Sequence, residues 1–215
     1  MVPMLAHPVV RVLVAALIVG GGMFAPIPFP FKVPILAALA LIVVWLETGG
    51  LAAAGLRRPA RWSATFAWAL LGAVLIVVGI GEIVLPLIEK AAGIEPDYSG
   101  YGALKGNLKA VLTMIAFAMV SAAIAEEIVF RGYLLHVLTS LLGEGRGAKA
   151  ISVIVSAAVF AVPHYEQGPI GMVTVFLTGL ILGWLFFQTR RNLFALIIAH
   201  GLVDIWGLGS LYFGV

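Results

Sequence analysis

The chain has 215 residues, of which 62% are hydrophobic and 11% are charged, and its mean hydropathy is +1.13. Soluble domains average about 45–50% apolar and about 25% charged residues, so this composition predicts an integral membrane protein. The absence of cysteine excludes disulfides, thiolate metal sites and cysteine nucleophiles. The net charge of +3 gives no reason to expect nucleic-acid binding, because basic membrane-protein loops account for it.

Apolar segments long enough for membrane-spanning helices, which need about 20 residues, recur along the whole chain. The first is expected to be retained in the mature protein, because no convincing small-residue cleavage site follows it. We therefore predict one all-α domain over residues 1–215, a polytopic membrane helix bundle with about seven transmembrane helices, or eight if the long fourth segment breaks in two. The expected segments are 8–28, 33–48, 64–87, 108–142, 148–163, 170–189 and 193–212.

The charged loops between these segments predict an orientation. Basic residues gather in "RRPAR" (57–61), "GEGRGAK" (143–149) and "RR" (190–191). By the positive-inside rule, we expect these loops and the amino terminus with Arg11 on the cytoplasmic side. The opposite side receives Lys32, Lys90, Lys105, Lys109, Glu95 and Asp97. The polar segment 90–107 is expected to be an exposed loop or a helix lying on the surface, and no chemistry is assigned to it.

The stretch "AEEIVFRGYLLHVL" (125–138) places three charged side chains inside the fourth apolar segment. An ionised group at a helix centre costs about 2.5–3.5 kcal/mol on insertion scales, so these side chains require partners or a water-filled cavity. Glu127 and Arg131 are four residues apart, in the favourable order for a helical ion pair, which we expect them to form. Glu126 points about 100° away from Glu127 on an α-helix, so its partner must come from another segment.

Polar side chains in other apolar segments are the candidate partners. His164 ends the fifth segment in "FAVPH". His200 and Asp204 are four residues apart in "AHGLVD" on the seventh segment, so they share a helix face. Ionisable residues inside membrane helices usually face the bundle interior and mark functional sites.

Each of these features also has a structural explanation. A buried pair such as Glu127–Arg131 is more often structural than catalytic. His164 would cap a helix at the water interface, and His200 with Asp204 would form a polar clasp between helices. Three further ionisable residues are expected at the membrane interface: His136, Glu82 and Glu89.

The segments "EEIVFRGYL", "FAVPH" and "AHGLVD" resemble the EExxxR, FxxxH and HxxxN/D motifs of the CAAX prenyl protease type II and bacteriocin-processing family, also called CPBP or Abi. The resemblance spans residues 126–204, with the motifs in the family's order. Gly132, Tyr133 and "GLRRP" (55–59) also resemble the family. The resemblance implies an intramembrane endopeptidase, with seven or eight helices around a polar cavity open toward the cytoplasm and a motif-bearing core over residues 108–212.

The resemblance further implies a role for each of four residues. Glu126 matches the family's catalytic glutamate, and His164 matches its partner in activating water. His200 matches a residue that stabilises the oxyanion. Asp204 occupies a position that is Asn in the eukaryotic-type enzymes. Because an ionised aspartate cannot donate to an oxyanion, we expect Asp204 to orient His200 instead.

No cofactor is favoured, although zinc is possible because Glu, His and Asp are competent zinc ligands. The sequence contains no HExxH motif and no closely spaced ligand triad, which favours a metal-free, glutamate-dependent hydrolase. The serines near the motifs lack the glycine setting of a GxSxG nucleophile, and no GxGD signature occurs. The zinc alternative would use Glu126, His164, His200 and Asp204, and the serines are Ser121, Ser152 and Ser156.

The expected partners are the lipid bilayer and a membrane-associated peptide or protein substrate, and the expected location is the bacterial cytoplasmic membrane. Two other functions stay open. One is a non-enzymatic membrane scaffold or bacteriocin-immunity protein of the same fold, against which the intact motif set argues. The other is a small proton-coupled transporter, which is disfavoured because no internal repeat is detectable.

Overall fold

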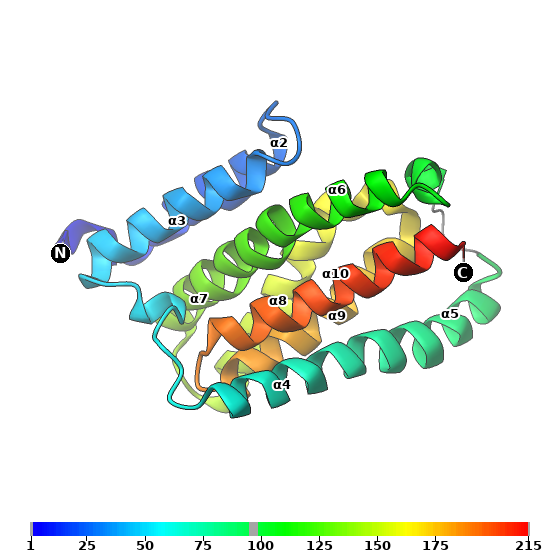
Figure 1. The fold of residues 1–215 in the computed structure, drawn as a ribbon. Coiled ribbons are helices and arrows are strands. Elements are labelled where there is room, and N and C mark those ends of the chain that lie inside the picture. Colours follow the sequence, from blue (N-terminus) through cyan, green and yellow to red (C-terminus); the bar gives the residue numbers. More distant parts are fainter. Residues whose placement is uncertain (1, 95–98, 215) are drawn as a thin grey trace.

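A computed structural model describes residues 2–94 and 99–214 as a bundle of helices, with no strand in these ranges (Figure 1). The predicted all-α class is confirmed. Glu95 and Asp97, which were assigned to a loop, lie outside the described residues. The first half of the chain contains η1 (Pro3–Ala6), α1 (Pro8–Ala15), η2 (Ala16–Gly21), α2 (Gly22–Phe24), α3 (Lys32–Thr48), η3 (Ala52–Ala54), α4 (Trp62–Val74), η4 (Leu75–Val84) and α5 (Leu85–Ala92).

The second half of the chain forms the centre of the bundle, in which the central run Leu108–Leu142 is one long helix. This run packs against α3 on one side and the last helix on the other. The elements are η5 (Ser99–Leu104), α6 (Leu108–Ala118), η6 (Met119–Leu134), α7 (Leu135–Leu142), α8 (Arg146–Ala161), η7 (Val162–Gln167), α9 (Gly168–Gln188) and α10 (Leu193–Phe213).

Among the described residues, four helices are long and apolar enough to cross a membrane: Trp62–Ala92, Leu108–Leu142, Arg146–Gln188 and Leu193–Phe213. The expected seven or eight crossings are therefore not confirmed. One reason is that α3 has only 17 residues and the first apolar helix is also short. The other is that α8 and α9 count together as one run of 43 residues.

That run nevertheless reverses direction at η7. A Cβ built at Gly179 of α9 would lie 2.8 Å from the Cβ of Ala157 in α8, and one at Gly183 would lie 2.8 Å from Val153 Cγ1. Residue numbers rise along α9 as they fall along α8, so the two helices are antiparallel. The missing side chains at these glycines permit their close approach.

The central run departs from the α-helix that the spacing predicts. Residues Met119–Leu134 are π-helical, and the backbone N–H of Leu135 donates to the carbonyl of Phe130, five residues earlier. π-helical turns are rare and frequently occur at functional sites, although η2 and η4 are also π-helical in this structure. The segment contains the whole EExxxR motif and is buried from Glu127 to Leu134. The motif therefore lies in the interior of the bundle.

The loops gather at two ends of the bundle. At the first, Arg191 donates to the Glu144 carboxylate, and the N–H of Leu193 donates to the Gly55 carbonyl (3.2 Å). We call this end, with loops 49–61, 143–145 and 189–192 and the amino terminus, the arginine end (Figure 1).

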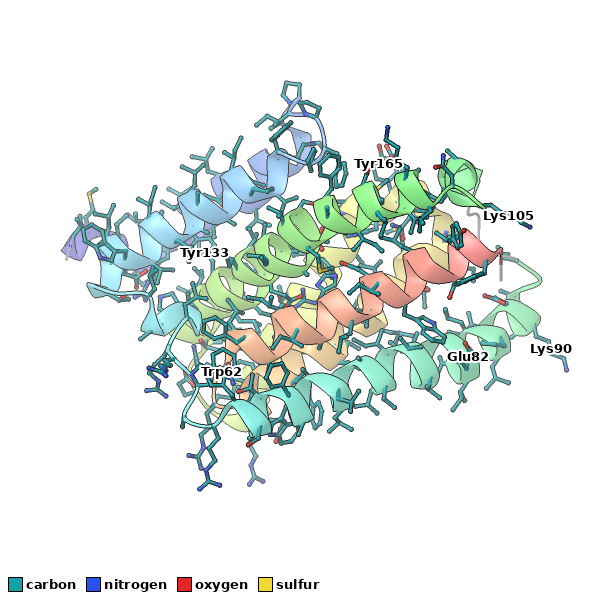
Figure 2. All side chains as sticks on the ribbon, in the orientation of Figure 1. Trp62, Glu82, Lys90, Lys105, Tyr133 and Tyr165 are labelled. Atoms are coloured by element: carbon teal, nitrogen blue, oxygen red, sulfur yellow. The ribbon has the colours of Figure 1, made fainter. Side chains whose placement is uncertain are left out.

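At the other end, the N–H of Gly106 donates to the carbonyl of Tyr212 (3.0 Å), which joins η5 to the end of α10. We call this end, with residues 99–107, η7 and the end of α10, the distal end. Figure 2 shows Lys90 and Lys105 at the distal end and Trp62 at the arginine end.

Close helix packing near the arginine end depends on Gly72 of α4. A Cβ at this position would lie 2.9 Å from Leu185 Cδ2 of α9 and 3.3 Å from Ala199 Cβ of α10. Gly79, two turns further along the same run, has no atom within 4 Å of the corresponding point. The helical run Trp62–Ala92 therefore packs tightly against α9 and α10 at Gly72 and has open space at Gly79.

We predict that Gly72→Val lowers the free energy of unfolding by about 1–3 kcal/mol, the usual range for overpacking a filled site. Gly79→Val is the matched control, with the same substitution on the same run, and should change stability much less. The measurement is the midpoint of thermal unfolding in detergent, followed by loss of the monodisperse peak on size exclusion. Equal midpoints for the two variants would contradict the packing described at Gly72.

Candidate active site

The centre of the polar cluster is the carboxylate of Glu127, which is fully buried. Its Oε1 accepts from Arg131 NH1 at 2.9 Å, so the ion pair expected from the spacing is present. The same oxygen lies 2.8 Å from Nδ1 of His200 on α10. A carboxylate is an acceptor, so His200 donates through Nδ1. Glu127 therefore joins η6 to α10 as well as pairing within its own helix.

The hydrogen bond at Nδ1 fixes the direction of the other ring nitrogen of His200. Nε2 lies 4.0 Å from Oε2 of Glu126 and 3.7 Å from Oδ1 of Asp204. The partner that Glu126 required from another segment is thus His200. Asp204, which was expected to orient His200, lies near Nε2, and Glu127 lies closer to the ring at Nδ1.

Phe160 of α8 packs against several members of this cluster. The Arg131 guanidinium carbon lies 4.4 Å above the centre of the Phe160 ring, a cation–π contact. The same ring meets the rings of His164 and His200 edge-on, with centroids 5.1 Å and 6.4 Å away. Sequence reasoning gave Phe160 no role, although it is the first letter of the FxxxH motif.

His164 lies in η7, where the chain reverses between α8 and α9. Its backbone angles (φ −94°, ψ 15°) are not helical. Its Nδ1 lies 2.9 Å from the carbonyl oxygen of Phe160, to which it donates, so the ring caps the end of α8. Nε2 is then left as an acceptor. The helix-capping explanation and the chemical one are therefore compatible, because they use different ring nitrogens.

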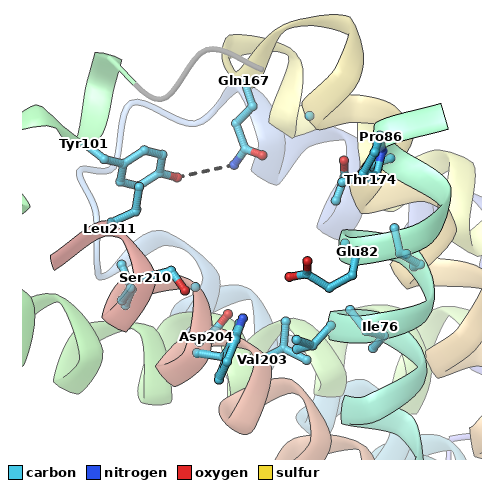
Figure 3. A pocket seen from close by; sticks show the side chains of 18 of the residues that line it. Ile76, Glu82, Pro86, Tyr101, Gln167, Thr174, Val203, Asp204, Ser210 and Leu211 are labelled. Carbon is cyan, nitrogen blue, oxygen red and sulfur yellow. Dashed lines mark hydrogen bonds between the residues drawn. The ribbon is translucent and has the colours of Figure 1, made fainter. Parts of the chain in front are cut away.

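Three of the four candidate residues line two cavities. Glu126 and His164 line a cavity of about 390 Å³, which is completed by the α2–α3 region at Gly22, Val33 and Leu36. Asp204 lines a larger cavity of about 680 Å³ between η4, α5, α9 and α10 (Figure 3). His200, whose Nε2 lies within 4.0 Å of both Glu126 and Asp204, links the two sets.

The larger cavity is also lined by two glutamates that were expected at the membrane interface. These are Glu82 and Glu89, and Glu82 points into the cavity in Figure 3. They line it because α5 continues the helix of η4, so the end of the run Trp62–Ala92 borders the cavity. Their carboxylates make the cavity acidic together with Asp204.

Tyr101 of η5 also lines the larger cavity, although the sequence analysis assigned no chemistry to its segment. Gln167 Nε2 donates to its hydroxyl at 3.5 Å, across the mouth of the cavity (Figure 3). Burial raises the pKa of the Tyr101 phenol, the bond from Gln167 lowers it, and the charges of Asp204 and Glu126 raise it. The phenol therefore stays protonated and offers an O–H donor at the cavity wall.

His136, which was expected at the membrane interface, is buried between helices. Its Nε2 lies 3.4 Å from Oε2 of Glu47 on α3, and Glu47 also pairs with Arg11 on α1. This second cluster ties the two amino-terminal helices to α7, away from the candidate active site. Sequence reasoning missed Glu47 because it closes an apolar segment just before two glycines, a position that is typical of exposed residues.

The three serines considered as nucleophiles are engaged in other contacts. Ser156 donates to the carbonyl of Phe130 at 3.0 Å, which joins α8 to η6. Ser121 and Ser152 each donate to the backbone carbonyl four residues earlier. Such back-bonds are a usual way for a membrane helix to satisfy a hydroxyl, so all three serines have a structural explanation.

Among residues 2–94 and 99–214, no group of three His, Asp or Glu side chains is placed to hold one metal ion. The zinc ligands suggested as an alternative do not form such a group in this structure. Glu126 and His164 line one cavity, whereas Asp204 lines the other.

Residues 108–206 match the family model described as type II CAAX prenyl endopeptidase Rce1-like. The matched segment, which is less than half of the 215 residues, is similar in sequence to this family. It runs from α6 into α10 and contains all six residues of the predicted site, so the resemblance seen in the motifs is confirmed. At family level, the match supports a CAAX-type intramembrane protease. No curated protein and no solved structure matches the chain.

We predict that Arg131→Met lowers the free energy of unfolding by about 3–5 kcal/mol, because Glu127 would lose one of its two partners while staying buried. The measurement is thermal unfolding together with the yield of monodisperse protein. Arg146→Met, at an exposed arginine, is the control and should change stability by less than about 0.5 kcal/mol. Equal losses in both variants would show that the buried pair contributes little.

Proposed function

We propose that this protein is an intramembrane endopeptidase in which Glu126 activates a water molecule for attack on a peptide bond. The observation that carries the proposal is that Glu126 and His164 share one cavity while Nε2 of His200 lies 4.0 Å from the same carboxylate. Amide hydrolysis needs three groups. One accepts a proton from water, a second accepts a hydrogen bond from the same water, and a third donates to the oxygen on which negative charge develops.

In the proposed first step, water binds between Glu126 and His164. The water oxygen forms a bond to the peptide carbonyl carbon, and one water proton passes to the Glu126 carboxylate. His164 accepts a hydrogen bond from the water through Nε2, which is available because Nδ1 donates to Phe160. The carbonyl electron pair moves to its oxygen and gives a tetrahedral oxyanion.

In the proposed second step, His200, protonated on both nitrogens, donates from Nε2 to this oxyanion. The bond between carbon and nitrogen then breaks, and the proton held by Glu126 passes to the leaving amine. The products are a new carboxyl end and a new amine, without a covalent enzyme intermediate. A carboxylate lies near each ring nitrogen of His200 and would stabilise a proton there. Glu127 lies at Nδ1, and Glu126 and Asp204 lie near Nε2.

We propose that Glu127, Asp204 and Arg131 position these groups rather than react. Glu127 holds the His200 ring through Nδ1, and Arg131 holds Glu127. Oδ2 of Asp204 is buried and has no hydrogen-bond partner among the described residues, so it can accept from a peptide N–H or from water. The substrate is proposed to be a membrane-embedded peptide, as the family suggests.

We predict that Glu126→Gln lowers cleavage by about 10²–10⁴-fold, the usual contribution of a general base, while the protein still inserts and folds. The assay is cleavage of a library of membrane peptides, with prenylated and unprenylated tails, in lipid nanodiscs and read by mass spectrometry. Glu144→Gln, the same change at the arginine end, is the control and should keep activity. Full activity in Glu126→Gln would overturn the mechanism.

We further predict that cleavage does not depend on a metal ion. The wild-type protein is dialysed against a zinc chelator and assayed with the same peptides, before and after zinc is returned. Unchanged rates are expected, because the proposed steps use protein groups alone. Loss of activity with the chelator and its recovery with zinc would instead support the alternative set of zinc ligands.

A further inference from the structure

The smaller cavity, which holds the candidate catalytic pair Glu126 and His164, is completed by the amino-terminal helices. The helical run 8–24 and α3 form a hairpin that packs beside η6 (Figure 1). We call it the amino-terminal hairpin. Its residues border the space in which a peptide bond would lie between Glu126 and His164. The lining residues from this hairpin are Val19, Gly22, Phe24, Lys32, Val33 and Leu36.

This cavity becomes apolar with depth. Its mouth is bordered by exposed side chains, among them Phe24 and Tyr165, whereas Val19 and Phe130 line it as buried residues. A volume of about 390 Å³ lies near the lower end of the range for ligand pockets, about 300–1,000 Å³. The cavity therefore has room for a short stretch of peptide, with an apolar side chain against its inner surface.

Leu36 lies where the packed face of α3 becomes a wall of this cavity. Ala37, Ala40 and Val44 of α3 are buried, and small residues at such positions let membrane helices approach closely. Spacings of three and four residues put Val33 and Leu36 on the same face. These two side chains are only half-buried, because the cavity lies beside them.

The amino-terminal hairpin is fixed to the rest of the bundle by the second buried polar cluster. Oε1 of Glu47 on α3 accepts from Arg11 Nε of α1 at 3.0 Å, and Oε2 lies 3.4 Å from Nε2 of His136 on α7. These contacts hold both helices of the hairpin in place. The position of Leu36 is therefore set by the fold of the protein before any ligand binds.

Gly22 leaves the space that the Leu36 side chain occupies. A Cβ built at Gly22 would lie 2.6 Å from Leu36 Cδ2 and 3.0 Å from its Cγ. Any side chain at this position would push Leu36 aside, and the open space beside Leu36 is the cavity. At Gly20, two residues earlier on the same helical run, an added Cβ would meet no described atom within 4 Å. Gly22 and Leu36 therefore depend on each other, and Gly20 does not share this contact.

We propose that Leu36, in the space left by Gly22, sets the largest substrate side chain that fits beside the cleaved bond. The proposal assigns a substrate subsite to the apolar inner part of the smaller cavity, next to Glu126 and His164. One methylene group more or less in such a pocket changes discrimination between substrates by about 10–200-fold. This inference rests on the proposed function for its reaction, whereas the subsite rests on the cavity and on the contact between Gly22 and Leu36.

Cleavage of peptides that differ in one side chain tests the size limit. The residues on either side of the cleaved bond of a library peptide are replaced in turn by Val and by Phe, and kcat/KM is measured. In Leu36→Ala we expect the ratio of Phe to Val peptides to rise by about 10-fold or more at one of the two positions. Leu39→Ala, the same change at an exposed residue of α3, is the control and should leave the ratio unchanged. No change in Leu36→Ala, or an equal change in both variants, would overturn the proposal.

The opposite change is expected in Gly22→Ala, because the added methyl group pushes Leu36 into the cavity. The ratio of Phe to Val peptides should fall by about 10-fold, and Gly20→Ala should leave it unchanged. In the double variant Gly22→Ala with Leu36→Ala, the ratio should equal that of Leu36→Ala alone. A fall that persists in the double variant would overturn the coupling between the two residues. If Gly22→Ala alone does not fold, Leu36→Ala and the double variant still decide the question.

Binding separates this inference from the proposed function. Fluorescent copies of the Val and Phe peptides are titrated into the Glu126→Gln protein in lipid nanodiscs, with and without Leu36→Ala. We expect the ratio of the two Kd values to shift by about 10-fold toward the Phe peptide without any hydrolysis. If the wild type cleaves no peptide, Val and Phe are scanned along the library peptide that binds most tightly. A shift in Kd would then support the subsite and overturn the proposed function alone, and no shift at any position would overturn the subsite.

Discussion

The buried carboxylate of Glu127 is the contact on which the rest of the site depends. One oxygen accepts hydrogen bonds from both Arg131 and His200. A single carboxylate therefore joins two helices through residues that are 73 positions apart in the sequence. Because ionised groups inside a membrane bundle require partners, this cluster can form only when η6 and α10 are correctly packed. The packing of η6 against α10 therefore also aligns the His200 ring toward Glu126.

Local spacing predicted those parts of the site that one helix determines. The Glu127–Arg131 pair follows from a separation of four residues, and the shared face of His200 and Asp204 follows in the same way. The contact from His200 to Glu127 was not predictable, because it depends on how α10 is rotated against η6. The π-helical form of η6 was also missed, since hydropathy indicates an apolar helix without revealing its hydrogen-bond register.

The sequence could not assign contacts to polar residues near the ends of apolar segments. Glu82, Glu89 and His136 were expected at the membrane interface because each lies near a predicted helix end, and Glu47 was given no role. In the structure His136 and Glu47 pair inside the bundle, while Glu82 and Glu89 line the larger cavity. Their positions follow from where the neighbouring helices run, which one sequence does not contain.

The walls of the two cavities come partly from outside the segment that holds the candidate site residues. That segment, residues 108–206, matches the family model and provides Glu126, His164, His200 and Asp204. Other wall residues come from α2, α3, η4 and α5, which precede that segment. Under the proposed function, changes in these amino-terminal helices can alter which peptides bind while the four candidate residues keep their positions.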